Sequence, residues 1–117
     1  MALEGALDAS VSADAVSFSF TVTNGGDEPV SMQFMTGCKA DFVVKTADAH
    51  DDGDGEEVWR FTDGRMFTQV ISTEQLGPGQ SETFRGVWDD PEPGEYTATG
   101  ILKANNADCK AHTQFSV

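Results

Sequence analysis

Six carboxylates lie close together in the middle of the chain, and they form the densest group of potential metal ligands. Clustered carboxylate oxygens suit hard cations, so a calcium loop is the chemistry that this segment suggests. The spacing does not fit such a loop: with Asp48 as its first ligand, Trp59 would stand where a bidentate Glu is required. We therefore expect a solvated hairpin tip without metal. The six residues are Asp48, Asp51, Asp52, Asp54, Glu56 and Glu57.

The remaining reactive side chains form no catalytic group. His50 and His112 are isolated in the sequence, and neither has a Ser or Cys partner implied by spacing. No GxSxG motif is present, and the Gly25-Gly26 pair is not followed by the GK[ST] of a phosphate-binding loop. The sequence therefore predicts no enzyme activity, no catalytic residue and no cofactor.

The two cysteines, Cys38 and Cys109, are far apart, and neither belongs to a CxxC pair. Structural zinc needs more Cys or His at short spacing than the chain supplies. Two free thiols are the expectation for a reducing cytoplasm. A Cys38–Cys109 disulfide is the alternative if both residues lie at the same end of the domain.

The charge balance excludes several kinds of partner. The net charge is −13, from 20 acidic and 7 basic side chains. Binding to nucleic acid or to an anionic membrane depends on Lys and Arg, so we expect neither. The acidity could attract a cationic partner or reflect a high-salt cytoplasm. We adopt the second explanation, a halophilic host, because the charge is spread along the chain.

Length and hydropathy indicate one cytoplasmic domain. The 117 residues fit a single core, which we assign to residues 1–117. No apolar run approaches the roughly 20 residues that a membrane helix needs. The first ten residues carry Glu4 and Asp8 and no basic residue, unlike a secretory signal.

Short strands must position all of these residues. Residues 16–22 alternate between apolar and polar side chains, the pattern of a half-buried strand. Turn signals recur at short intervals, among them residues 24–27, 76–79, 91–94 and 105–108. No segment shows a helical stripe. The pattern predicts an all-β, immunoglobulin-like antiparallel sandwich of about eight or nine strands.

The expected strands cover most of the chain. A hairpin is predicted across the acidic segment, and residues 66–71 are either a strand or a single helical turn. The other strands are expected at 3–11, 16–22, 30–34, 42–44, 58–61, 83–88, 96–102 and 111–117. Trp59 and Trp88 each lie in an alternating strand, so we expect both in the core.

One segment is more specific than this general pattern. VWRFTDGRMFTQ, at residues 58–69, resembles the signature of the BsuPI family, the intracellular proteinase inhibitor domain. In that family a Trp-bearing strand leads into a Ser/Thr-Asp-Gly turn, followed by a Phe and a Gln. The flanking segments are similar to the family's other strands: FTVTN (20–24), MQFMTGCKADFVV (32–44), LGPGQSETFRGVW (76–88) and PGEYTATGIL (93–102).

The resemblance implies an immunoglobulin-like sandwich that inhibits an intracellular serine protease by protein–protein binding. A monomer acting on a subtilisin-like protease is the expected form. The alternative is a non-inhibitory protein-interaction or scaffolding module of the same fold.

The candidate protease-contact loop is residues 62–67. Substrate-like inhibitors present a rigid, extended loop from which one side chain enters the specificity pocket, and Arg65 or Met66 could supply it. In the second interpretation Asp63-Gly64 is only a turn, and Met66 and Phe67 pack into the core. The sequence is compatible with either interpretation. The loop comprises Thr62, Asp63, Gly64, Arg65, Met66 and Phe67.

Overall fold

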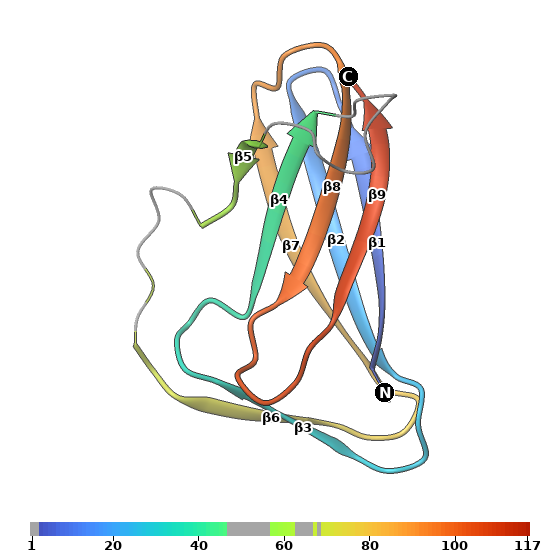
Figure 1. Cartoon of the computed structure of the whole chain (residues 1–117), viewed down its shortest axis with the longest axis vertical. Helices are drawn as coiled ribbons and strands as arrows, with labels where there is room; N and C mark the ends of the chain where they lie inside the picture. The colour runs from blue at the N-terminus through green and yellow to red at the C-terminus, as the bar shows by residue number, and fades with distance from the viewer. Residues whose placement is uncertain (1–2, 47–56, 63–66, 68) are drawn as a thin grey trace.

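A computed structural model describes residues 3–46, 57–62, 67 and 69–117. The described part is all-β, and nine strands are present in it (Figure 1). They are β1 (Leu3–Val11), β2 (Ala15–Asn24), β3 (Val30–Phe34), β4 (Ala40–Thr46), β5 (Glu57–Arg60), β6 (Ser72–Leu76), β7 (Ser81–Asp89), β8 (Glu95–Leu102) and β9 (Lys110–Ser116).

The strands form two antiparallel sheets that face each other and a smaller ribbon. One sheet has the order β1-β2-β7 and the other β5-β4-β8-β9. The ribbon pairs β3 with β6 and lies across one end of the sandwich (Figure 1). This arrangement confirms the immunoglobulin-like sandwich predicted from the strand pattern.

The core lies between the two sheets and follows the alternation in the sequence. Val16, Phe18, Phe20 and Val22 of β2 are buried. The ring of Phe18 stacks across the sandwich on Phe42 of β4, with centroids 5.9 Å apart. Strand β4 is buried on both faces over its first five residues, as expected of a strand near the centre of its sheet.

Asn24 connects the end of β2 to the ribbon. Its side chain is buried, and its Nδ2 donates to the carbonyl oxygens of Glu28 (2.7 Å) and Leu76 (2.9 Å). Its Oδ1 accepts a hydrogen bond from Gly26 N–H at 2.9 Å. The Asn24-Gly25-Gly26 break seen in the sequence is therefore a side-chain-stabilised turn.

The structure differs from the sequence predictions in two segments, residues 66–71 and strand β6. Residues 66–71 were expected to form a strand or a helical turn, but Phe67 and residues 69–71 form neither; Met66 and Thr68 lie outside the described residues. Val70 and Ile71 are exposed, so their apolar side chains do not serve the core. Strand β6 was not predicted because Ser-Thr-Glu-Gln-Leu carries one apolar residue and pairs only with β3.

The hairpin predicted across the acidic segment is confirmed by the pairing of β4 with β5. The turn predicted at residues 105–108, between the strands expected at 96–102 and 111–117, is confirmed as a hairpin by the pairing of β8 with β9. The described part of the chain contains no helix that is long and apolar enough to cross a membrane.

Candidate functional site

Strand β5 leads directly into the candidate loop, and its pairing with β4 fixes where the loop begins. Val43 pairs with Arg60, and Val44 pairs with Trp59. Beyond the end of β5, Phe61 N–H donates to the carbonyl of Phe42 at 2.9 Å. The backbone is thus held to β4 up to the residue that precedes Thr62.

A buried carboxylate holds the side chain of Thr62. Asp41, in β4, is only 2% exposed. Its Oδ1 accepts from Phe42 N–H at 2.8 Å, and its Oδ2 accepts from Arg60 Nη1 at 3.0 Å and from Thr62 Oγ1 at 3.1 Å. Three donors therefore satisfy a carboxylate that would otherwise be costly to bury.

Arg60 joins this buried carboxylate to a surface one. Its Nη2 lies 2.9 Å from Glu57 Oε1, and its Nε donates to Glu57 Oε2 at 3.3 Å. The hydrogen bond that Arg60 donates to Glu57, followed by the one that it donates to Asp41, raises the pKa of Arg60 above its ordinary value. The same hydrogen bond lowers the pKa of the Glu57 carboxyl. The planar guanidinium therefore orients the end of β5 through two carboxylates.

The other end of the candidate loop is held by aromatic packing. Phe67 is half-buried, and its ring lies 6.4 Å from that of Phe61. Phe61 in turn makes edge contacts with Phe42 at 5.7 Å and with Trp59 at 6.3 Å. The loop is thus anchored at Thr62 by polar contacts and at Phe67 by an aromatic contact. Asp63, Gly64, Arg65 and Met66 lie outside the described residues.

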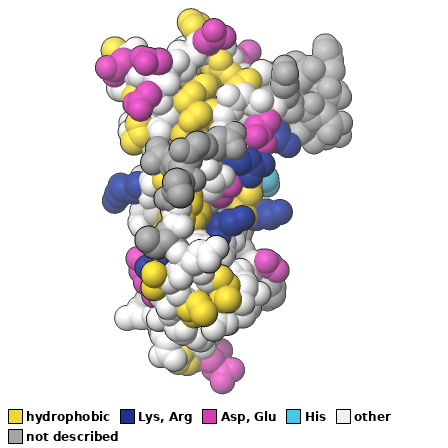
Figure 2. All heavy atoms as spheres, turned by 90° about the vertical axis from the view of Figure 1, so that its left-hand side faces the viewer, with side chains coloured by type: hydrophobic (Ala, Val, Ile, Leu, Met, Phe, Trp, Pro, Cys, Tyr) yellow, Lys and Arg dark blue, Asp and Glu magenta, His cyan; other side chains and the backbone are white. Residues whose placement is uncertain are grey.

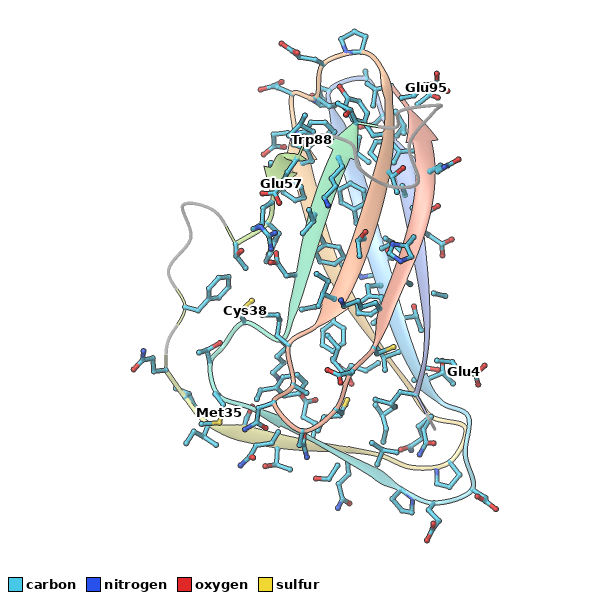
Figure 3. All side chains as sticks on the ribbon, in the orientation of Figure 1. Glu4, Met35, Cys38, Glu57, Trp88 and Glu95 are labelled. Atoms are coloured by element: carbon cyan, nitrogen blue, oxygen red, sulfur yellow. The ribbon has the colours of Figure 1, made fainter. Side chains whose placement is uncertain are left out.

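The two tryptophans belong to the aromatic core, as predicted. Trp88 is buried, and Trp59 is half-buried against the core. Their rings stack with centroids 6.1 Å apart. Figure 3 places Trp88 at the end of the sandwich where Glu57 and β5 lie. Trp88 of β7 therefore supports Trp59 of β5 from beneath, and the two rings form no surface platform.

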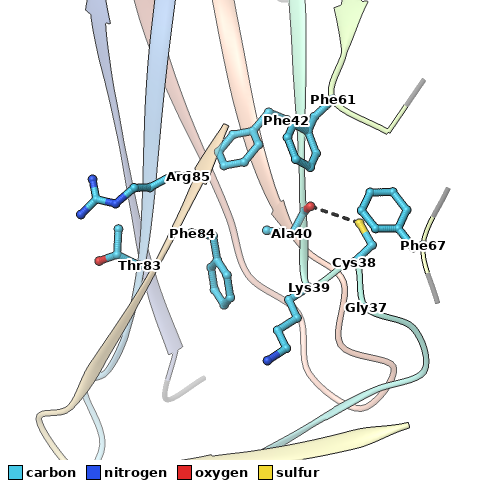
Figure 4. Close-up of a pocket in the computed structure, with 10 residues that line it drawn as sticks. All are labelled: Gly37, Cys38, Lys39, Ala40, Phe42, Phe61, Phe67, Thr83, Phe84 and Arg85. Carbon is cyan, nitrogen blue, oxygen red and sulfur yellow. Dashed lines mark hydrogen bonds between the residues drawn. The ribbon is translucent and has the colours of Figure 1, made fainter. Parts of the chain in front are cut away.

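A cavity of about 340 Å³ opens beside Phe67, between the edges of the two sheets. Figure 4 shows the rings of Phe42, Phe61, Phe67 and Phe84 around it. At Gly86 of β7, an added Cβ would lie 2.9 Å from Phe42 and 3.1 Å from Phe61, so only glycine allows this approach without a shift. The full lining is Gly37, Cys38, Lys39, Ala40, Phe42, Phe61, Phe67, Thr83, Phe84 and Arg85.

The cysteines are both free and buried. Cys38 Sγ donates to the carbonyl of Ala40 at 3.3 Å. Burial raises the pKa of both thiols, and the nearby Asp41 carboxylate adds to the shift at Cys38. The predicted free thiols are thus confirmed, and the raised pKa values favour their protonated form near neutral pH.

The acidic segment lies mostly outside the described residues, which include only Glu57 of its six carboxylates. No group of His, Cys, Asp and Glu suited to a metal ion occurs among the residues that the structure describes. His50 also lies outside them. His112 is exposed, and its Nδ1 lies 2.9 Å from Thr99 Oγ1.

Sequence reasoning missed the Asp41–Arg60 pair. The available signal was a single carboxylate inside the apolar stretch of residues 40–44. Such a residue needs a buried partner, but the sequence does not say which cation supplies it.

These features define a small β-sandwich domain with a loop anchored at both described ends. The chain belongs to the BsuPI family, described as intracellular proteinase inhibitors, because that family's model matches residues 3–107. The family consists of inhibitors and not of enzymes. Comparison with curated proteins finds no match to this chain.

Solved structures share the fold. β-Glucosidase 3B from Thermotoga neapolitana matches with a TM-score of 0.54 at 16% identity, covering 98% of this chain and 16% of that chain. A Bifidobacterium adolescentis GH3 β-glucosidase matches with a TM-score of 0.52 at 14% identity, covering 98% of this chain and 17% of that one. The Kluyveromyces marxianus β-glucosidase gives 0.51 at 16% identity, with coverages of 98% and 14%.

This chain therefore spans only about a sixth of the length of the enzymes it resembles. At such low identity the likeness concerns the sandwich alone.

Proposed function

We propose that this protein inhibits an intracellular subtilisin-like serine protease by placing the loop of residues 62–67 in the enzyme's cleft. Membership of the BsuPI family supports the inhibitory activity. The observation that supports this loop is its anchoring: Thr62 is bonded to buried Asp41, and Phe67 packs on Phe61.

Anchoring favours tight binding for a physical reason. A loop that is ordered before binding loses less conformational entropy when it enters a cleft. In this proposal Arg65 or Met66 fills the specificity pocket of the protease. The Asp41–Arg60 pair acts from below by holding the start of the loop, without touching the enzyme.

The same proposal covers the setting in which the protein works. It acts as a monomer in the cytoplasm of a halophilic host, with residues 1–117 as one domain. The net charge of −13 supports the monomer, because two copies repel each other, and supports a high-salt host, where carboxylates stay screened.

Inhibition of a purified subtilisin-like intracellular protease tests the proposal. We expect titration with the wild-type domain to abolish cleavage of a peptide substrate, in buffer of high ionic strength. Alanine substitution at each of residues 62–67 should weaken inhibition, most strongly at Arg65 or Met66. An exposed residue on another strand, Thr73 of β6, is the control.

Two outcomes would contradict the proposal. Full protease activity at excess domain would favour a non-inhibitory protein-interaction or scaffolding module. Inhibition that no substitution in the loop changes would place the contact elsewhere on the sandwich.

A further inference from the structure

One edge of the β1-β2-β7 sheet is a long strand, β7, which has no described neighbour on its outer side. Strand β7 spans nine residues and is terminal in its sheet. Its nine pairs with β2 run without a register shift. The opposite edge strand, β1, lies alongside β9, whereas no strand among the described residues pairs with the outer side of β7. Natural proteins seldom leave a long regular edge without protection or use.

The register shows which backbone groups of β7 face this outer side. Asn24 N–H donates to Gln80 O at 3.0 Å at one end of the β2–β7 ladder, and Asp90 N–H donates to Asp14 O at 2.9 Å at the other. Hydrogen-bonded pairs alternate along an antiparallel ladder, so the even-numbered residues of β7 bond to β2. The N–H and C=O groups of Thr83, Arg85 and Val87 consequently point away from β2.

The aromatic cavity lies beneath this edge. Phe84 of β7 forms one wall, and Phe61 and Phe67 form the wall on the side of β5. In Figure 4 these rings face the space between the sheets, whereas the guanidinium of Arg85 points away from it. A strand added to β7 would alternate in the same way, with every second side chain entering the cavity.

The charges near the cavity differ from those of the chain as a whole. Its ten lining residues include Lys39 and Arg85 but no carboxylate, although the chain carries 20 acidic and 7 basic residues. Lys39 is paired with Glu74 at 2.6 Å. Arg85 contacts Ser19 Oγ at 3.3 Å and makes no ion pair within the described part of the chain. Figure 2 shows Lys and Arg side chains gathered across the middle of one face, among hydrophobic ones.

We infer that β7 binds an extended segment of a partner protein as an additional strand. In this segment an acidic residue lies between two apolar residues. Its backbone pairs with Thr83, Arg85 and Val87. Its acidic residue lies opposite Arg85 on the outer face, where cross-strand charge pairs form. The two apolar neighbours turn inward to the cavity. This mode of strand addition takes affinity from the backbone and specificity from alternate side chains.

A second copy of this chain is a poorer occupant than such a peptide. Two copies of net charge −13 repel each other. Strand β7 also has no carboxylate flanked by two large apolar residues, since Glu82 lies between Ser81 and Thr83, and Asp89 lies between Trp88 and Asp90. The inference is independent of the protease-contact loop and can hold whether or not the domain inhibits a protease.

The probe is the capped heptapeptide Gly-Thr-Phe-Glu-Phe-Thr-Gly, titrated to about 2 mM, where even a millimolar dissociation constant is measurable. Two-dimensional NMR of the full chain follows the backbone amides. We expect the amides of Thr83, Arg85 and Val87 to shift and to gain protection from hydrogen exchange. A peptide with Lys in place of Glu should bind more weakly.

Two variants at one position isolate the backbone contact. Thr83→Pro removes an outward N–H and leaves the bonds of β7 to β2 in place, and proline is tolerated at such edge positions. Thr83→Val loses the same hydroxyl, which contacts Thr21, but keeps the N–H. We expect Thr83→Pro to bind the peptide about three- to tenfold more weakly than Thr83→Val, the effect of one lost hydrogen bond.

A charge reversal keeps the inference testable if Thr83→Pro does not fold. Arg85 is exposed, so the Arg85→Glu variant should fold. It should bind the Glu peptide more weakly than the wild type does, and the Lys peptide more tightly. The inference is overturned if the Glu peptide shifts no β7 amide, or if Thr83→Pro and Thr83→Val bind it equally. Dimerisation that Thr83→Pro abolishes would assign the edge to a second copy and also overturn it.

Discussion

Arg60 Nη1 lies 3.0 Å from Oδ2 of Asp41, and so joins the last residue of β5 to a carboxylate that is 2% exposed. β5 is a four-residue edge strand with a register irregularity against β4. A strand this short gains little stability from its backbone hydrogen bonds to β4 alone. The Asp41–Arg60 pair therefore holds β5, and with it the start of the candidate loop, together with the packing of Trp59 on Phe18 and Trp88.

Loss of the buried carboxylate should destabilise the fold. Asp41→Ala leaves Phe42 N–H, the Arg60 guanidinium and the Thr62 hydroxyl without their acceptor. We expect the free energy of unfolding to fall by about 2–4 kcal/mol, toward the lower figure because Arg60 keeps access to water. Guanidinium-induced unfolding measures the change. Glu57→Gln is the control and should cost far less; equal effects would mean that burial of Asp41 is unimportant.

The Glu57–Arg60 pair should make stability depend on pH in the acid range. The hydrogen bond from Arg60 lowers the pKa of Glu57 in the folded state. The stabilisation is therefore complete above the pKa of an unfolded glutamate and is lost as the pH falls through the lowered value. Melting curves of wild type and Glu57→Gln should separate near neutral pH and converge in acid. A pH-independent difference would contradict this assignment.

The buried thiols should react slowly. Burial raises the pKa of Cys38 and Cys109, so little thiolate exists near neutral pH. We expect alkylation by iodoacetamide at least about tenfold slower in the native chain than in urea. Any stability from the protonated thiols is complete below the pKa of unfolded thiols and lost as the pH rises through the raised folded values. The Cys109→Ser variant reports the alkylation rate of Cys38 alone, and the difference from the wild type gives the rate of Cys109. Alkylation as fast in the native chain as in urea would show that the thiols are accessible.

The anchors of the candidate loop should affect inhibition more than stability, if the proposed function holds. Thr62→Val removes the hydroxyl that donates to Asp41, and Phe67→Ala removes the ring that packs on Phe61. We expect each to raise the inhibition constant by about tenfold, mainly through faster dissociation. Thr73→Val, on exposed β6, is the matched control. Unchanged inhibition in both variants would show that anchoring does not matter for binding.

Salt should stabilise the folded chain. With a net charge of −13, the folded state concentrates like charges that screening relieves. The melting temperature should rise as KCl is increased from about 0.01 M to about 1 M, while the Debye length shortens. Glu4→Gln with Asp8→Asn, on exposed positions of β1, should reduce this dependence. A melting temperature insensitive to KCl would argue against a high-salt host.

The strands that the sequence predicted well share one property. In β2 and β8, apolar and polar residues alternate because one face of each strand is buried and the other is not. β6 lacked this signal, because it pairs only with β3 in a ribbon that crosses one end of the sandwich. The apolar pair Val70-Ile71 suggested structure that does not form, because nothing buries it.

The order of residue types along this chain was enough to determine the all-β class, the turns, the acidity and the family, since each depends on local alternation or on composition. Only the tertiary structure decided that Asp41 is the partner of Arg60 and Thr62, that Phe67 packs on Phe61, and that β7 ends its sheet beside an aromatic cavity with no further strand among the described residues. These contacts depend on which strands become neighbours. Strand order is set by the packing of the whole sandwich, which no local pattern in the sequence records.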